Sequence, residues 1–231
     1  MIIERPSPNF GDRGGQPVDM LVIHYTGMET AGVALDRLLD PAAQVSAHYL
    51  IDEDGGVYRL VEEAKRAWHA GVSFWRGATD INRRSIGIEL VNPGHRFGYR
   101  PFSEAQMAVL VDLCIDIVRR HGIPARNVVG HSDVAPRRKE DPGEFFDWRR
   151  LAEAHVGLWP GEADACSMDP EHVAAMLAAI GYETVDRLAS LRAFQRHFRP
   201  ARVNGRIDFE TARRLQALCA LCEADSALVT D

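Results

Sequence analysis

Short apolar stretches rich in β-branched residues recur along the first 155 residues, and they constrain the fold most strongly. The clearest is Met20 to Thr26, which is broken by Gly27 and has the pattern of a strand buried on both faces. Related patterns predict strands at 47–51, 57–60, 85–92 and 127–130, and helices at 31–39, 103–122 and 145–155. Strands separated by helices predict an α/β domain over 1–156, with a central mixed β-sheet flanked by helices.

The pattern changes after residue 156. Turn-forming residues predict a linker over 157–168, and the remaining 169–231 have the pattern of a small three-helix domain. We expect its helices to begin at Asp169-Pro170, to span 187–198, and to begin again at Asp208 or Thr211. The spacing of apolar residues predicts inward faces made of Leu188, Leu191, Phe194 and Phe198 on the second helix, and of Ala212, Leu215 and Leu218 on the third.

Length and charge exclude several classes of protein. A chain of 231 residues fits one domain plus a small one, and a net charge of −6 argues against a nucleic-acid-binding protein. No apolar stretch is long enough to span a membrane. The first residues show no secretory signal, so we expect a cytoplasmic location, or a periplasmic one if the sequence is truncated. We expect a monomer.

The four cysteines, Cys114, Cys166, Cys219 and Cys222, are expected to be reduced thiols. Cys219 and Cys222 have CxxC spacing, but they lie in an apolar helical run. This context favours buried helical thiols over a redox centre. A structural zinc site would need a second pair of ligands, and none is obvious nearby.

Three residues could hold a metal ion. His24 lies at the end of a buried strand, His131 follows the short strand that ends at Gly130, and Asp141 comes ten residues later. Two imidazoles and a carboxylate can bind zinc and leave a fourth position for water, whose pKa zinc lowers to about 7. Spacing alone leaves an alternative open, because a histidine at a strand end is often only hydrogen-bonded within the core.

Glu89 and Lys139 are candidates for proton transfer and charge stabilisation. Glu89 interrupts an apolar strand, where a buried carboxylate is costly unless it is paired or used. It is either a general base beside the metal or an outward-facing charge. Lys139 lies two residues before Asp141 and either stabilises an oxyanion or is a solvated loop residue.

Aromatic residues gather in the segment after the second and third predicted strands. Trp68 and His69, with Phe74-Trp75, either stack against sugar rings or form a small hydrophobic cluster that fixes the loop. His48 either lines the same cleft or only forms hydrogen bonds within the sheet.

Six segments occur in an order that is typical of one enzyme family. The segments are VIHYT (22–26), VSAHYLI (45–51), AWHAG (67–71), SIGIEL (85–90), VGHSD (129–133) and KEDPG (139–143) with FFDW (145–148). Over about residues 17 to 155 the chain resembles the zinc-dependent N-acetylmuramoyl-L-alanine amidases of the second amidase family. That family shares its fold with peptidoglycan-recognition proteins and amidase-type phage lysozymes.

The resemblance implies a role for each candidate residue. His24, His131 and Asp141 match the ligands of one catalytic Zn²⁺, Glu89 matches the catalytic glutamate, and Lys139 matches the lysine that supports the transition state. The segment with Trp68 and His69 matches one that lines the substrate cleft.

The implied reaction is hydrolysis of the amide between the lactyl group of N-acetylmuramic acid, or its 1,6-anhydro form, and L-alanine of the stem peptide. Such a reaction belongs to peptidoglycan turnover and recycling. The alternative is a muropeptide-binding or sensor protein without catalysis, against which the complete residue set argues. A zinc peptidase is disfavoured because no HExxH motif occurs.

The C-terminal part resembles a three-helix peptidoglycan-binding module over 191–198 and 204–212, but Arg206 and Phe209 depart from its usual pattern. It therefore either binds the cell wall or only packs on the first domain. This two-part layout resembles amidases of the AmiD type, which are usually exported and membrane-anchored. In showing no secretory signal, the sequence instead resembles the cytoplasmic AmpD type. We therefore expect its substrates to be imported anhydro-muropeptides.

Overall fold

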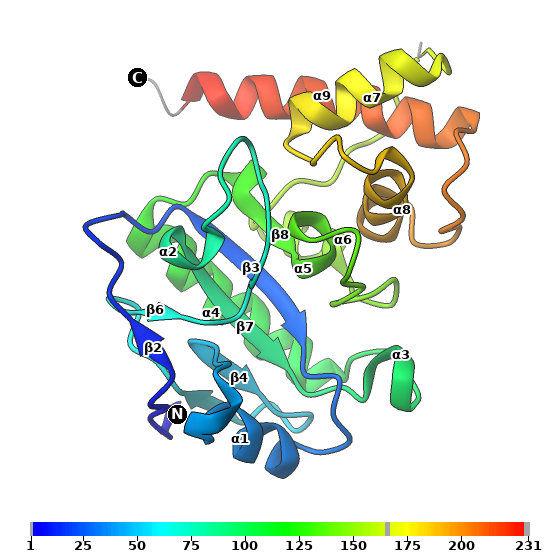
Figure 1. Ribbon diagram of the computed structural model, residues 1–231. Coiled ribbons are helices and arrows are strands. Elements are labelled where there is room, and N and C mark those ends of the chain that lie inside the picture. Colours follow the sequence, from blue (N-terminus) through cyan, green and yellow to red (C-terminus); the bar gives the residue numbers. More distant parts are fainter. Residues whose placement is uncertain (1, 165–166, 229–231) are drawn as a thin grey trace.

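The computed structural model describes residues 2–164 and 167–228 and contains a six-stranded mixed sheet (Figure 1). Its strands are β1 (Ile2–Glu4), β3 (Met20–Tyr25), β4 (Tyr49–Ile51), β5 (Val57–Arg59), β7 (Ser85–Leu90) and β8 (Val128–Gly130). Their order is β1-β5-β4-β7-β3-β8, and β4, β7, β3 and β8 run parallel. β5 is antiparallel to β4, so the sheet is mixed as expected.

A second, two-stranded sheet is formed by β2 (Phe10–Gly11) and β6 (Arg66–Ala67). The helices are α1 (Ala31–Leu39), α2 (Ile81–Arg84), α3 (Gly94–Phe97), α4 (Glu104–His121), α5 (His131–Val134), α6 (Trp148–Glu153), α7 (Pro170–Ile180), α8 (Arg187–Phe198) and α9 (Phe209–Leu228). Short 3₁₀ turns span Pro41–Ala43 and Ala125–Asn127.

The central strands are buried on both faces, which confirms the expectation for β3. Leu21 and Ile23 point toward the cluster that includes residues of α4. Met20 and Val22 point to the opposite face, where the functional residues of the sheet also lie. In Figure 1, α4 covers the sheet from behind, while α2 and α5 lie on the near side.

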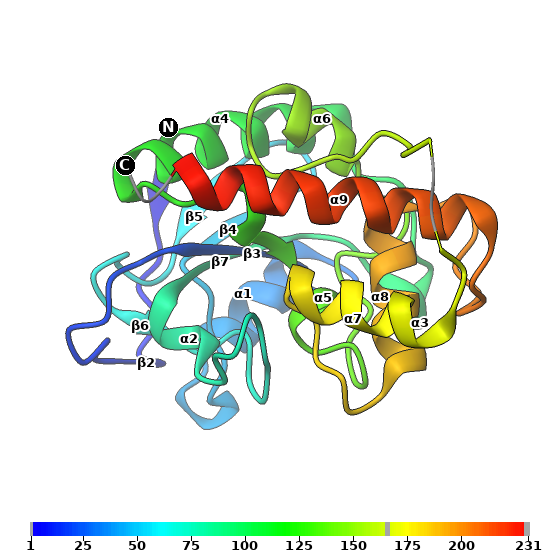
Figure 2. The same ribbon diagram turned by 90° about the horizontal axis from the view of Figure 1, so that it is seen from above.

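The three C-terminal helices form a bundle that packs against the rest of the protein. In Figures 1 and 2, α7 and α9 lie above the sheet, and α8 descends beside α5. One hydrophobic cluster joins Met20, Val22 and Val134 to Leu177 and Phe194 of the bundle. The bundle therefore shares a core with the sheet instead of being attached only through residues 157–168.

Local signals explain where several helices begin and end. The Ser103 side chain accepts a hydrogen bond from the Gln106 N–H at the start of α4, and left-handed Gly122 ends that helix. The helix expected at 145–155 is shorter and spans Trp148–Glu153. It begins there because the Asp147 side chain caps its N-terminus by accepting a hydrogen bond from the Arg150 N–H. β1, β2 and β6 were not expected from the sequence.

The bundle follows the expected pattern with one correction. Leu191, Phe194 and Phe198 are buried, but Leu188 is 49% exposed. A helix turns by about 100° per residue, so Leu188 lies about 120° around the axis from Phe194, at the edge of the apolar stripe. On α9, Ala212, Leu215 and Leu218 point inward as expected.

The cysteines in the described part of the chain occupy helices. Cys114 lies in α4, and Cys219 and Cys222 lie in α9, as the apolar helical run predicted. Burial raises the pKa of the Cys219 thiol to about 12 and that of the Cys222 thiol to about 11. Cys166 lies outside the described residues.

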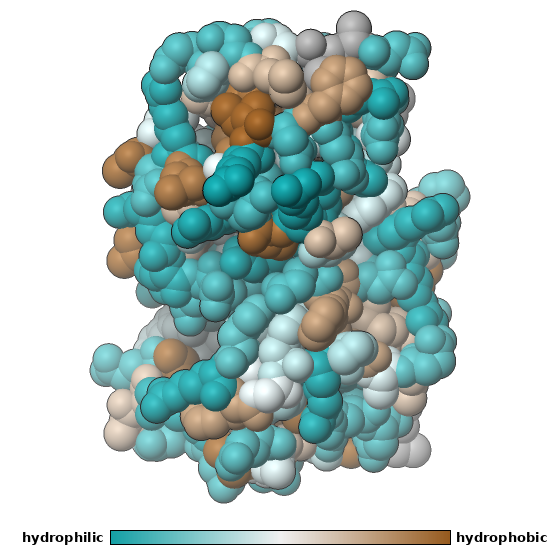
Figure 3. All heavy atoms as spheres, turned by 90° about the vertical axis from the view of Figure 1, so that its right-hand side faces the viewer, coloured by the Kyte–Doolittle hydropathy of each residue, from teal (hydrophilic) through white to brown (hydrophobic). Residues whose placement is uncertain are grey.

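No helix in residues 2–164 and 167–228 is long and apolar enough to cross a membrane. The face shown in Figure 3 is largely hydrophilic, and its apolar side chains occur in separate small groups.

Candidate active site

Neighbouring parallel strands bring the predicted functional residues to one edge of the sheet. His24 lies near the end of β3, and its register partner on β7 is Glu89. β8 ends at Gly130, so His131 begins α5 at the same edge. The loop that follows α5 returns Asp141 to this point, where the Asp141 carbonyl accepts a hydrogen bond from the Ser132 N–H (2.8 Å).

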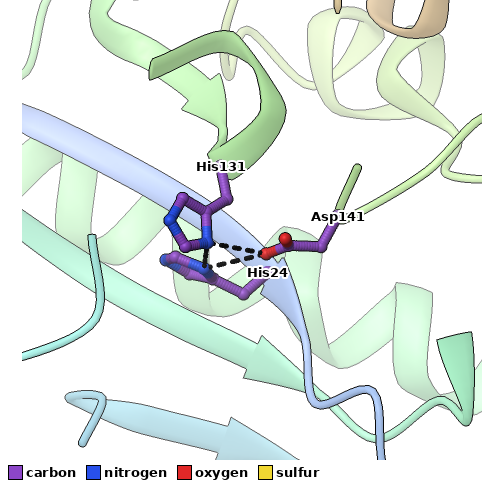
Figure 4. A group of neighbouring side chains, drawn as sticks. All are labelled: His24, His131 and Asp141. Carbon is purple, nitrogen blue, oxygen red and sulfur yellow. Dashed lines mark hydrogen bonds and ion pairs between the residues drawn. The ribbon is translucent and has the colours of Figure 1, made fainter. Parts of the chain in front are cut away.

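His24, His131 and Asp141 meet at a single point (Figure 4). The two Nδ1 atoms lie 2.9 Å apart, and each lies 3.0 Å from Oδ2 of Asp141. All three residues are at most 5% exposed. Their possible ligand atoms all lie within 4.8 Å of one another, so these residues can hold a metal ion.

A chain of hydrogen bonds fixes the proton on His24. The Ser85 hydroxyl donates to the Ile81 carbonyl (2.7 Å), so its oxygen accepts from Nε2–H of His69 (3.1 Å). Nδ1 of His69 is then an acceptor, and it receives Nε2–H of His24 (3.0 Å). Nδ1 of His24 therefore carries a lone pair that faces the cluster.

His131 has the same tautomer for a different reason. Its Nε2 lies 3.1 Å from the Ala70 carbonyl, which can only accept, so Nε2 carries the proton. Two nitrogen lone pairs and a carboxylate oxygen then face one another without a proton to share. This arrangement is repulsive by itself and fits a divalent cation placed between the three atoms.

Burial controls the charges in the site. Burial, with His131 nearby, lowers the pKa of His24 to about 4, so its imidazole is neutral at pH 7. Burial, reinforced by Asp141, raises the pKa of Glu89 well above its ordinary value.

A cleft of about 630 Å³ opens over the cluster. Its walls include Glu89, Lys139, Trp68 and His69, so the structure brings these predicted residues together beside the three possible metal ligands. Sequence reasoning missed other lining residues: Tyr25, Thr26, Gly27, Met28, Arg37, Leu38, Val45, Ser46, Arg96, Arg138 and Glu140. Those at 25–28 follow His24 directly and could have been included, whereas nothing local marks Arg37 or Arg96.

His48 does not line the cleft, so its prediction as a substrate-binding residue is corrected. It is fully buried, and its Nδ1 accepts a hydrogen bond from the Gly87 N–H (3.0 Å). Its Nε2 lies 2.9 Å from the Arg13 guanidinium and 3.1 Å from the Lys65 carbonyl. These contacts agree with the other role that the sequence left open for His48, which is hydrogen bonding within the sheet.

The two tryptophans of the 68–75 segment have different surroundings. Trp68 lines the cleft, but Trp75 is only 2% exposed and packs edge-on against Tyr182 of the bundle. For Trp75, the hydrophobic-cluster alternative is therefore the correct one. His69 remains at the cleft wall, with both ring nitrogens bonded within the protein.

Comparison with known proteins identifies the family. The sequence pattern of a family described as N-acetylmuramoyl-L-alanine amidase matches residues 14–144. AmiD of Escherichia coli K12 is 38% identical over 229 residues, covering 87% of this chain and 82% of that protein. AmpD of Haemophilus influenzae is 37% identical over 163 residues, covering 62% of this chain and 86% of that protein.

Solved structures agree over both parts of the chain. E. coli AmiD, in complex with anhydro-N-acetylmuramic acid-L-Ala-D-γ-Glu-L-Lys, has a TM-score of 0.80 and 37% identity, covering 94% of this chain and 93% of that one. AmpDh3 of Pseudomonas aeruginosa has a TM-score of 0.77 and 36% identity, covering 94% and 95%. The fold, the site and these similarities together show that the chain belongs to the N-acetylmuramoyl-L-alanine amidase family.

Proposed function

We propose that this protein hydrolyses the amide bond between the lactyl group of an N-acetylmuramoyl sugar and L-alanine, with one Zn²⁺ held by His24, His131 and Asp141. The observation that carries the proposal is the convergence of two imidazole lone pairs and a carboxylate in a cleft that a second carboxylate, Glu89, also lines. Two nitrogen ligands and one oxygen ligand suit zinc and leave a position open.

A Zn²⁺ ion bound there would polarise the amide carbonyl and lower the pKa of a coordinated water to about 7. Glu89 is placed to take the proton from the attacking water. Glu89 lines the cleft, and no described residue hydrogen-bonds to its Oε2, so this oxygen can take a proton from a molecule bound there. The same carboxyl then passes the proton to the departing amine of L-alanine.

Lys139 supplies a positive charge at the mouth of the site. It lines the cleft beside Asp141, and its ammonium favours the charged form of Glu89. We assign it to the negative charge that develops on the carbonyl oxygen during attack. Trp68 lies on the same cleft wall and is suited to stacking on a sugar ring.

The substrate is proposed from the relatives. E. coli AmiD was solved with an anhydro-N-acetylmuramic acid tripeptide, and AmpDh3 with an anhydromuramic pentapeptide. We therefore propose that this protein acts on anhydro-muropeptides in peptidoglycan recycling. Action in the cytoplasm, as a monomer, remains a prediction from the sequence.

Digestion of two substrates tests this proposal. The protein is incubated with 1,6-anhydro-N-acetylmuramyl-tripeptide and, separately, with intact sacculi, each with and without a chelator. We expect release of tripeptide from the soluble substrate, and loss of that release with the chelator. Release from sacculi as well would show a broader wall amidase and overturn the recycling assignment. Release from neither substrate would favour a muropeptide sensor.

Two substitutions test the assigned roles. Glu89→Gln should lower kcat by about 10²- to 10⁴-fold, because the general base is lost. Lys139→Ala should lower it by about 10²- to 10³-fold, because a charge that stabilises the transition state is removed. Both should keep bound zinc, measured by metal analysis, and Glu223→Gln, an exposed carboxylate on α9, serves as the matched control. A wild-type rate for Glu89→Gln would contradict the mechanism.

A further inference from the structure

We propose that the C-terminal bundle supports the metal site, and that Tyr182, His197 and Arg196 are positioning residues that hold the segments carrying His131 and Asp141. The proposal rests on the metal centre assigned above. It gives the bundle a role in the catalytic half of the protein, beyond packing and independent of any binding to the cell wall.

The first contact runs through Asp133, which lies two residues after His131 in α5 and is only 1% exposed. Its Oδ2 accepts hydrogen bonds from the Gly130 N–H (2.7 Å) and from Nδ1 of His197 (2.7 Å). Its Oδ1 accepts the Tyr182 hydroxyl (2.7 Å). Two of these three partners belong to the bundle, so a buried carboxylate beside a metal ligand depends on the bundle for its hydrogen bonds.

Both bundle partners are themselves fixed by packing. His197 is 3% exposed, and its ring stacks on Trp148 with a centroid distance of 3.8 Å and an interplanar angle of 19°. Tyr182 is 1% exposed and meets Trp75 edge-on at 5.1 Å. Because both side chains are held by their own packing, their hydrogen bonds to Asp133 constrain where α5 begins.

The second contact reaches the loop that carries Asp141. Arg196 on α8 is 8% exposed, and its guanidinium lies 3.2 Å from a carboxylate oxygen of Glu140 and 3.9 Å from one of Glu144. These two glutamates flank Asp141 in the sequence. One bundle side chain therefore pairs on both sides of the possible metal ligand.

These contacts act on the site through position. His24 belongs to β3, but His131 and Asp141 come from the two segments that the bundle holds. A metal site requires its ligands within about 0.5 Å of the correct geometry, and loss of an outer hydrogen-bond partner typically costs 10- to 100-fold in metal affinity. Weakening the bundle contacts should therefore lower the affinity for the metal more than the affinity for the substrate.

The experiment compares Zn²⁺ affinity, by chelator competition, in the full chain and in single variants. Tyr182→Phe and His197→Gln should each weaken binding by about 10- to 100-fold. They should also change the absorption spectrum of the Co²⁺-substituted protein, and at saturating zinc KM should change less than kcat. Thr211→Val is the matched control: it removes a fully buried hydroxyl of α9 that accepts hydrogen bonds from Gln195 (3.2 Å) and Arg199 (3.1 Å), both within the bundle.

Zinc affinity within twofold of the wild type in Tyr182→Phe and His197→Gln, with only a lower Tm, would overturn the proposal. An equal loss of affinity in Thr211→Val would also overturn it, because the effect would then be general destabilisation of the bundle. If either variant fails to fold, Arg196→Gln provides the test through its own loop, with the same expected loss. Zinc binding is read without substrate, so failure of the proposed amidase activity would be seen separately.

Discussion

At the scale of single residues, the site depends on where two protons lie. Ser85, through His69, places the proton of His24 on Nε2, and the Ala70 carbonyl does the same for His131. Both Nδ1 lone pairs are thereby directed at the same point. His69 is part of this arrangement because its ring packs directly over Gly87 on β7.

Gly87→Ala tests this arrangement. A Cβ at position 87 would lie 2.5 Å from Cγ of the His69 ring, too close for any real contact, so the ring must move. The hydrogen bond from His24 to His69 would then be lost or distorted. We expect metal affinity, measured by chelator competition, to fall by about 10- to 100-fold, and hydrolysis at limiting zinc to fall with it.

Gly161→Ala is the control for this change, since a Cβ there meets nothing within 4 Å. It should leave zinc affinity and rate at wild-type values. If Gly87→Ala bound zinc as tightly as the wild type, the hydrogen bond between His69 and His24 would not be what directs Nδ1 to the metal.

At the scale of elements, the sequence predicts what local signals determine. β3 and β7 are mostly apolar runs, and α4 has its own cap at Ser103 and its own stop at Gly122. β1, β2 and β6 have only two or three residues each, and they are strands because distant segments pair with them. Such pairing has no local signature, so these strands could not be predicted.

Local signals likewise predict some residues of the candidate site and not others. His24, His131, Asp141 and Glu89 follow or occupy clear strands, and the parallel arrangement of those strands brings them together. The role of His48 could not be decided from the sequence, because the Gly87 amide and the Arg13 side chain that bond to it lie 39 and 35 residues away. The contacts of Asp133 with Tyr182 and His197 span 49 and 64 residues, so they could not be predicted from the sequence either.

At the scale of the whole molecule, one hydrophobic cluster runs from the sheet into the bundle, and Figure 2 shows α9 passing over the sheet. Arg126, just before β8, adds an ion pair with Asp225 of α9 (2.7 Å). Two parts that share buried side chains in this way are expected to lose their structure together, because neither can keep its apolar face covered alone.

Metal binding should therefore stabilise the bundle as well as the sheet. A ligand that binds only the folded state at 100 times its Kd adds about 2.7 kcal/mol, which for a chain of this size corresponds to a rise in Tm of about 5 to 10 °C. We expect far-UV circular dichroism, dominated by helices, and tryptophan fluorescence to show one coincident transition that zinc shifts upward. His24→Ala should abolish the shift because it removes a ligand. Two separate transitions, with zinc moving only one, would mean that the shared core does not couple the bundle to the metal site.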